Sequence, residues 1–168
     1  LDWLAQRQPD VVCLQETKTE DSKFPAAELQ AAGYQVVFSG QKTYNGVAIL
    51  SRHAAGDVRA GIPAFTDEQK RVLAVTVNGM RIVWAYVPNG QSVDSEKYLY
   101  KLEWLAAFEH WIAGELTLHP RLAVLGDYNI APADEDVHDP KAWEGQVLCS
   151  ARERDAFGRL LSLGLRDG

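Results

Sequence analysis

The sequence VLAVTVNGMRIVWAYV at residues 72–87 contains the clearest structural signal in the chain. Two apolar, β-branched runs, Val72–Val77 and Met80–Val87, are separated only by Asn78-Gly79. An Asn-Gly pair suits a type I′ turn, which needs positive φ at both central residues and connects antiparallel strands. We therefore predict a β-hairpin over this segment.

Segments on both sides of the hairpin alternate between strand-like and helix-like patterns. Val11–Leu14 and Leu122–Leu125 are continuous apolar runs of strand length, which predicts strands buried on both faces. Over residues 95–118 apolar side chains recur every three or four positions, which predicts an amphipathic helix capped by Asp94 or Ser95. Because strands and helices alternate but a hairpin is also present, we expect the α/β class, of the α+β type. The other predicted elements are a first helix ending at Pro9, helices over 25–32 and 153–163, and strands over 34–38 and 47–50.

The composition is that of one globular domain. The 168 residues are 46% hydrophobic and 24% charged, which excludes a disordered chain or a fibrous repeat and predicts a single domain over 1–168. No apolar run approaches the roughly 20 residues of a membrane span, so we expect no membrane partner. The two cysteines, Cys13 and Cys149, are too few for a disulfide framework. They predict free thiols in a reducing, cytoplasmic compartment, with Cys13 in the core.

The net charge of −6 bears on the possible partners. A protein that coats nucleic acid non-specifically is usually basic, so this balance argues against that class. It leaves open an enzyme that grips phosphates locally or through a metal ion.

Three predicted strands end in carboxylate, amide or phenol side chains. Glu16 follows the first strand, Tyr86 lies near the end of the hairpin, and Asp127 and Asn129 follow Leu125. Such groups at the ends of neighbouring strands can converge on one spot, and they suit Mg²⁺ and a phosphate. Each also has a structural interpretation: Glu16 as a loop carboxylate, Asp127 in an Asx-turn, and Tyr86 as a core aromatic.

Four segments together resemble a known family. VCLQETK at 12–18 resembles the LQET motif of the exonuclease III and apurinic-apyrimidinic endonuclease family, within the endonuclease/exonuclease/phosphatase superfamily. YNGVAILS at 44–51 resembles its Y-x-G-V-A segment, and AYVPNG at 85–90 its Y-x-P-N/Q-G motif. LGDYNIA at 125–131 resembles its G-D-x-N-I/V-A motif. The motifs follow the family's order and approximate spacing, and the resemblance implies a four-layer sandwich of two mixed β-sheets covered by helices.

The resemblance also implies a role for each matching residue. It makes Glu16 the main ligand of Mg²⁺, with Mn²⁺ as an alternative metal, and lets Asp127 and Asn129 touch the metal as well. Tyr86 becomes a catalytic residue beside the scissile phosphate. Asp127 either activates the attacking water or protonates the leaving oxygen, and Asn129 orients the phosphate.

Further residues are candidate substrate contacts. Arg71 stands where the family carries a basic residue that faces DNA, and Asn45 and Asn89 lie in loops on the substrate side. A solvated surface charge is the alternative for Arg71 and is favoured for Lys18. None of the histidines has the context of the family's catalytic histidine, so we expect structural or surface roles for all of them: His53, His110, His119 and His138.

The family also has motifs that this chain does not contain. These are an early strand ending in a metal-binding Asn, a later Asp, and an Asp-His pair near the C-terminus. Their places would lie before Leu1 and after Gly168, so we expect a chain truncated at both termini, with little or no catalysis by itself.

The function implied is a metal-dependent DNA-repair nuclease. It would hydrolyse phosphodiester bonds of duplex DNA as an abasic-site endonuclease and a 3′–5′ exonuclease, as a monomer in a bacterial-type cytoplasm. One alternative is a superfamily phosphatase or phosphodiesterase that acts on small phosphoesters. Another is a non-catalytic remnant that binds DNA or a protein. Activity on abasic duplex DNA distinguishes the first two, and Glu16→Gln or Asp127→Asn distinguishes a catalyst from a remnant.

Overall fold

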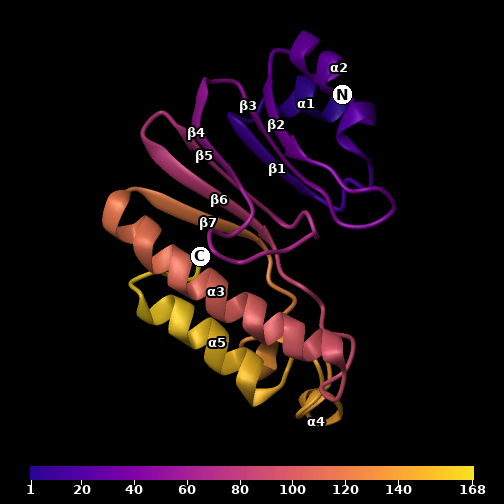
Figure 1. The fold of residues 1–168 in the computed structure, drawn as a ribbon, viewed down its shortest axis with the longest axis vertical. Coiled ribbons are helices and arrows are strands. Elements are labelled where there is room, and N and C mark those ends of the chain that lie inside the picture. The colour runs from indigo at the N-terminus through magenta and orange to yellow at the C-terminus, as the bar shows by residue number, and fades with distance from the viewer. The chain divides into compact units, whose positions relative to one another are not determined.

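The computed structural model describes residues 1–168 and divides them between two units, which we describe separately (Figure 1). The first unit holds both β-sheets and the N-terminal helices, and the second holds the long helices α3 (Glu96–Leu118) and α5 (Ala151–Ser162). The first unit comprises Leu1–Gly61, Thr66–Tyr86 and His119–Asp127, and the second comprises Ile62–Phe65, Val87–Leu118 and Tyr128–Gly168.

A three-stranded sheet in the first unit has the order β1-β3-β2, formed by Val11–Gln15, Val47–Ser51 and Gln35–Ser39. Both pairings are antiparallel. The prediction of two mixed sheets is therefore wrong for this sheet. The central strand β3 is buried along its whole length. Leu4 of α1 (Asp2–Arg7) and Leu29 of α2 (Ala26–Ala31) belong to the apolar cluster that includes Leu50 of β3, so these helices pack on one face of the sheet. A short 3₁₀ helix, η1 (Asp21–Lys23), precedes α2.

The second sheet is mixed and has the order β4-β5-β6-β7. The predicted hairpin is confirmed as β5 and β6, which pair antiparallel around Asn78 and Gly79 with φ values of 49° and 74°. Strands β6 and β7 run parallel, whereas β4 pairs antiparallel with β5. The strands span Ala55–Ala60, Val72–Val77, Met80–Tyr86 and Leu122–Asp127.

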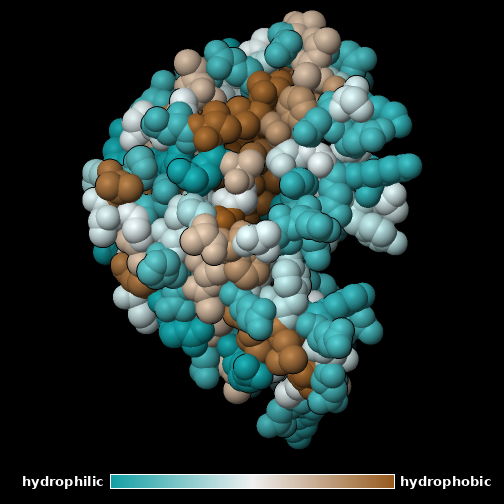
Figure 2. Space-filling view, viewed as in Figure 1, coloured by the Kyte–Doolittle hydropathy of each residue, from teal (hydrophilic) through white to brown (hydrophobic).

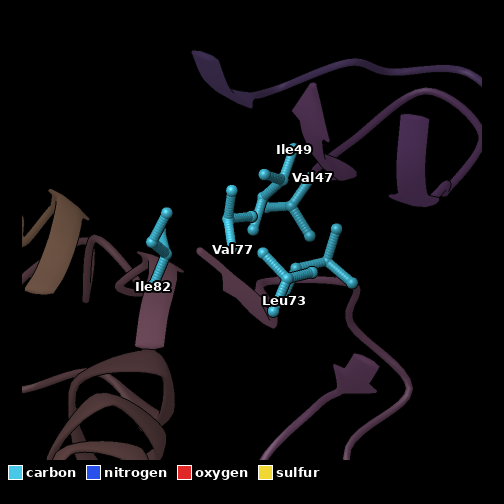
Figure 3. Packing of buried hydrophobic residues seen from close by; sticks show 6 residues of the cluster. Val47, Ile49, Leu73, Val77 and Ile82 are labelled. Atoms are coloured by element: carbon cyan, nitrogen blue, oxygen red, sulfur yellow. The ribbon is translucent and has the colours of Figure 1, made fainter. Parts of the chain in front are cut away.

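The core of the first unit lies between the two sheets (Figure 3). Val47 and Ile49 of β3 pack with Leu73, Val77 and Ile82 of the hairpin, and all five side chains are buried. Full burial of such a side chain contributes about 1.5–3 kcal/mol. This cluster therefore fixes the sheets against each other, and with them the strand ends that carry polar side chains.

Strands β1 and β7 are only half-buried, which corrects the prediction that both faces are covered. Leu14 is 38% exposed and Leu125 is 45% exposed. Each strand lies at the edge of its sheet and has one neighbour there. Cys13 is also only partly buried, although it packs against the core cluster. Figure 2 accordingly shows hydrophobic atoms at the surface in the area that β1 and β3 occupy in Figure 1.

Helices α3 (Glu96–Leu118) and α5 (Ala151–Ser162) pack on each other in the second unit. The predicted cap of α3 is Ser95, whose Oγ accepts a hydrogen bond from the backbone N–H of Tyr98 at 3.1 Å. The buried face of α3 recurs every three or four residues, as predicted. None of the helices has the length and apolar character needed to span a lipid bilayer. Two short helices complete this unit: η2 (Asp134–Asp136) and α4 (Pro140–Trp143).

Candidate active site

Three of the predicted functional side chains come together at the strand ends of the first unit. Glu16 directly follows β1, Tyr86 ends β6 and Asp127 ends β7. The parallel register pairs Tyr86 with Asp127, so neighbouring strands present them side by side. The Tyr86 Oη donates a hydrogen bond of 2.9 Å to Glu16 Oε1, which connects the two sheets.

The strand pattern explains why Tyr86 points toward Glu16. Alternate residues of a strand face the same side, so Ile82, Trp84 and Tyr86 all face the core between the sheets. The Trp84 Nε1–H donates a hydrogen bond of 2.8 Å to the carbonyl of Leu14, two residues before Glu16. Tyr86 is thus both a core aromatic and a hydrogen-bond donor to Glu16, which unites the two interpretations of this residue.

Gly126 determines where Asp127 lies. Its φ is +146°, and an added Cβ would stand 1.7 Å from the carbonyl oxygen of Ala85 on β6. Only glycine permits this close approach of β7 to β6. Asp127 Oδ2 in turn lies 3.5 Å from Gln15 Nε2, at the long limit of a hydrogen bond.

Glu16 is held as an anion. Its pKa is lowered first by the hydrogen bond from Lys18, whose Nζ lies 2.6 Å from Glu16 Oε2, and next by the hydrogen bond from Tyr86. Burial raises the pKa of Tyr86, and the hydrogen bond to Glu16 raises it further, so the phenol keeps its proton. Lys18 is therefore an ion-pair partner, although its side chain is 54% exposed. Glu16 also has a left-handed backbone with φ of 51°, which is uncommon for this residue type.

Arg71 packs against Tyr86 and is not a freely solvated charge. Its guanidinium lies 4.8 Å from the centroid of the Tyr86 ring, in a cation–π contact. The Nη1 donates to the Tyr86 carbonyl at 3.1 Å, and the Nε donates to Gln69 Oε1 at 2.8 Å. The structure thus places a cation on the face of the candidate catalytic tyrosine.

Asn45 is connected to the same cluster through Gln69. It is only 8% exposed, and its Nδ2 donates to Gln41 Oε1 at 3.0 Å and to Gln69 Oε1 at 3.3 Å. Gln69 therefore accepts hydrogen bonds from both Asn45 and Arg71. Sequence reasoning missed Gln69, because its partner Asn45 lies in a loop that is 24 residues away along the chain. The signal that was available is its place two residues before Arg71.

Asn89 and Asn129 lie in the second unit and contact each other. The Asn89 Nδ2 donates to Asn129 Oδ1 at 3.1 Å, and the Asn129 Nδ2 donates to the carbonyl of Val87 at 3.0 Å. Asn129 has φ of 48°, a left-handed conformation that asparagine adopts more readily than most residues. The buried ammonium of Lys101 donates to the backbone carbonyls of both asparagines. Lys101 is a second residue that sequence reasoning missed.

The oxygen groups of the first unit fit a hard divalent cation that is bound by few protein ligands. No group of three or more His, Cys, Asp or Glu side chains is arranged so that it could hold a metal ion. Glu16 supplies an ionised carboxylate that already pairs with the Lys18 ammonium. Mg²⁺ commonly binds through one or two carboxylates and completes its shell with water and phosphate oxygens. Glu16 and Asp127 match this pattern.

The burial of the histidines agrees with the predicted structural or surface roles. His53, His110 and His138 are exposed, and His119 is half-buried. His53 lies 3.6 Å from Asp10 at the other end of β1, where pairing with a carboxylate is a surface interaction.

Comparison with known proteins identifies the family. Residues 1–159 match the Endonuclease/Exonuclease/phosphatase family. Exodeoxyribonuclease III of Haemophilus influenzae is 32% identical over 95% of this chain and 64% of its own length. A 3′ phosphatase from Neisseria, solved with a product DNA hairpin, is 49% identical with a TM-score of 0.97, over 99% of this chain and 65% of that one. An AP endonuclease from Archaeoglobus fulgidus is 38% identical with a TM-score of 0.93, with the same coverage of 99% and 65%. The chain thus spans just under two thirds of these relatives' lengths, and it belongs to the Endonuclease/Exonuclease/phosphatase family.

Proposed function

We propose that the protein is a divalent-metal-dependent DNA-repair nuclease that hydrolyses phosphodiester bonds of duplex DNA. The proposed activities are incision at abasic sites and removal of nucleotides from 3′ ends in the 3′–5′ direction. The observation that carries the proposal is the hydrogen-bonded pair of Tyr86 and the ionised Glu16, beside Asp127, at the strand ends of a chain of this family. Relatives that act as an exodeoxyribonuclease, a 3′ phosphatase and an AP endonuclease support it.

The proposed division of roles follows from the chemistry of each group. Glu16 would hold Mg²⁺ or Mn²⁺, together with oxygen atoms of Asp127 and Asn129. When bound, the metal neutralises charge on the phosphate and favours ionisation of water. Tyr86 keeps its phenolic proton at neutral pH, because burial and Glu16 raise its pKa. It can therefore donate a hydrogen bond to a phosphate oxygen that replaces Glu16 Oε1 as the acceptor.

Asp127 is the proposed proton-transfer group. A carboxylate at this position can accept a proton from the attacking water or return one to the leaving oxygen. Asn129 is proposed to orient the phosphate through its amide, and Asn89 and Asn45 to support the substrate loops. Arg71 is proposed to place positive charge near a phosphate, since its guanidinium is fixed against the ring of Tyr86.

We further propose that residues 1–168 form part of one domain, that the protein acts as a monomer on duplex DNA, and that it works in the cytoplasm. Phosphate contacts made by Arg71 and the metal would make DNA binding weaken as salt rises. A salt titration of duplex binding measures this dependence.

The test uses the full-length protein with a duplex oligonucleotide that has one abasic site and a recessed 3′ end. p-Nitrophenyl phosphate is assayed separately as a small phosphoester. We expect incision and 3′ digestion with Mg²⁺, no turnover with EDTA, and little hydrolysis of the small phosphoester. Glu16→Gln and Asp127→Asn should each abolish turnover. Glu20→Gln, which changes an exposed carboxylate paired with Lys23, is the matched control and should keep it.

Two outcomes would refute the proposal. Preferential hydrolysis of the small phosphoester would favour a phosphatase of the same superfamily. Full-length protein that binds duplex DNA or a protein without any turnover, and whose binding is unaffected by Glu16→Gln, would favour a non-catalytic role.

A further inference from the structure

Lys101 presents its charge inside the protein. It lies on the apolar face of α3, in helical step with Tyr98, Trp104 and Leu105, and its side chain is 0% exposed. Its Nζ donates hydrogen bonds to the carbonyl of Asn89 at 3.1 Å and to the carbonyl of Asn129 at 2.5 Å. The ammonium thus joins two loops that are 40 residues apart in the sequence.

The counter-charge of Lys101 is itself fixed. Glu153 Oε1 lies 2.5 Å from Lys101 Nζ, and Glu153 is also 0% exposed. This carboxylate accepts hydrogen bonds from the backbone N–H groups of Leu148 at 3.1 Å and Ser150 at 3.2 Å, and from Ser150 Oγ at 2.6 Å. Glu153 and Ser150 form the capping box of α5, so the start of this helix holds the carboxylate in place.

The loops joined by Lys101 carry two of the proposed site residues. The Asn89 side chain donates to the Asn129 side chain, and the Asn129 side chain donates to the Val87 carbonyl. The Asn89 loop also packs against the stem of Lys101, because a Cβ added at Gly90 would lie 3.2 Å from Lys101 Cδ. The lysine therefore contacts this loop along its stem and through its ammonium.

Packing alone does not account for a lysine at this position. Buried lysines are rare, and replacement of a buried ion pair by apolar side chains of similar size is often neutral or stabilising. A methionine would fill the same face of α3 without a charge to desolvate. What methionine could not do is donate to two carbonyl groups at once.

We propose that Lys101 is a positioning residue, whose buried ammonium fixes the Asn89 and Asn129 loops relative to each other and so sets the direction of the Asn129 amide. The inference rests on the proposed function, in which that amide orients the scissile phosphate. A displacement of about 1 Å in a positioned group can lower the rate about 10²-fold. Loss of this connection should therefore appear in kcat.

The test compares three variants of the full-length protein. Lys101→Met/Glu153→Gln removes both charges and the connection between the loops. Glu153→Gln removes the counter-charge but leaves the ammonium and its two carbonyl partners. Glu115→Gln is the matched control, since Glu115 is 7% exposed on the same helix and accepts a hydrogen bond from Trp111, outside both loops.

We expect the double variant to be folded by circular dichroism, with kcat on abasic duplex DNA about 10²-fold lower and KM nearly unchanged. Hydrogen exchange should accelerate at residues 87–91 and 128–131 and stay unchanged in the remainder of α3. Glu115→Gln should keep kcat close to that of the wild type, and Glu153→Gln, which leaves the buried ammonium without its counter-charge, should destabilise the protein in a urea titration. A folded double variant with wild-type kcat and unchanged exchange in both loops would overturn the proposal.

A measurement on the wild-type protein needs no variant and no activity. The Nζ protons of an ammonium that donates to two backbone carbonyls should exchange slowly with water. The ¹⁵Nζ signal should then show scalar couplings across the hydrogen bonds to the carbonyl carbons of Asn89 and Asn129. Absence of these couplings would overturn the inference even if the protein is an active nuclease. If the couplings are present but the wild-type protein has no turnover, the proposed function fails while the connection between the loops stands.

Discussion

Substitution of Gly126 by alanine should be among the most destabilising single-methyl changes in the chain. The added Cβ would lie 1.7 Å from the carbonyl oxygen of Ala85, half of the 3.4 Å at which ordinary contact begins. The neighbouring atom is backbone in the adjacent strand β6, so no side chain can move aside. The φ of +146° is also one that L-residues rarely adopt.

The steric overlap and the strained backbone together give a rough loss in the free energy of unfolding. Overpacking of this kind costs about 1–3 kcal/mol, and a strained backbone conformation costs about as much. We expect a loss of about 4 kcal/mol in the free energy of unfolding, which is a urea midpoint lower by about 2 M at an m-value near 2 kcal/mol/M. Urea titration followed by circular dichroism measures the shift.

The same chemical change in α5 provides a control of opposite sign. Gly158 lies within that helix and has no atom within 4 Å of an added Cβ. Gly158→Ala should therefore stabilise the protein by about 0.5–1 kcal/mol, because alanine has the higher helix propensity. If Gly126→Ala lowers the midpoint by less than about 0.5 M, the close approach of β7 to β6 is not a real constraint, and the reasoning fails.

Three further predictions concern the first unit. Lys18→Met should raise the pKa of Glu16 toward its ordinary value of 4.5, since the lysine is the largest cause of the lowered pKa. A ¹³C titration of the Glu16 carboxyl group measures this pKa, and an unchanged value would contradict the ion pair. In the wild type the lowered pKa makes the stabilisation by Glu16 complete above 4.5, and it is lost as the pH falls through the lower folded-state pKa. Val75→Ala, in the fully buried core, should lower the free energy of unfolding by about 2 kcal/mol in a urea titration, and a near-zero change would refute the packing described. Burial raises the pKa of Cys13 to about 12, so iodoacetamide should alkylate it far more slowly at pH 8 than after unfolding, and equal rates would refute its burial.

Local patterns predicted the elements whose signals are contained in a few residues. The hairpin was predicted correctly because the Asn-Gly turn determines its own geometry, and the Ser95 cap and the buried face of α3 follow from helical spacing. Strand β4 was missed, because the sequence AGDVRA has no alternation and nearly the whole strand is exposed. The half-burial of β1 and β7 was missed because an apolar run cannot show which strands lie at a sheet edge.

Motifs predicted one part of the candidate site, and long-range contacts that motifs do not show form the other part. Glu16, Tyr86 and Asp127 were predicted together, and the structure brings them to adjacent strand ends. Gln69 and Lys101 were missed because each has a partner in a distant segment, Asn45 for Gln69 and Glu153 for Lys101. The position of Lys101 on the apolar face of α3 was a usable signal, since a charged residue at a core position of a helix needs a buried partner.

The parallel register of β6 and β7 has a consequence for how much the surrounding loops can vary. Tyr86 and Asp127 are opposite each other because of backbone pairing, and their placement does not depend on the loops that follow them. Those loops can change length and composition while the two side chains keep their spacing. Backbone pairing of this kind keeps the two side chains opposite each other whatever the sequence of those loops.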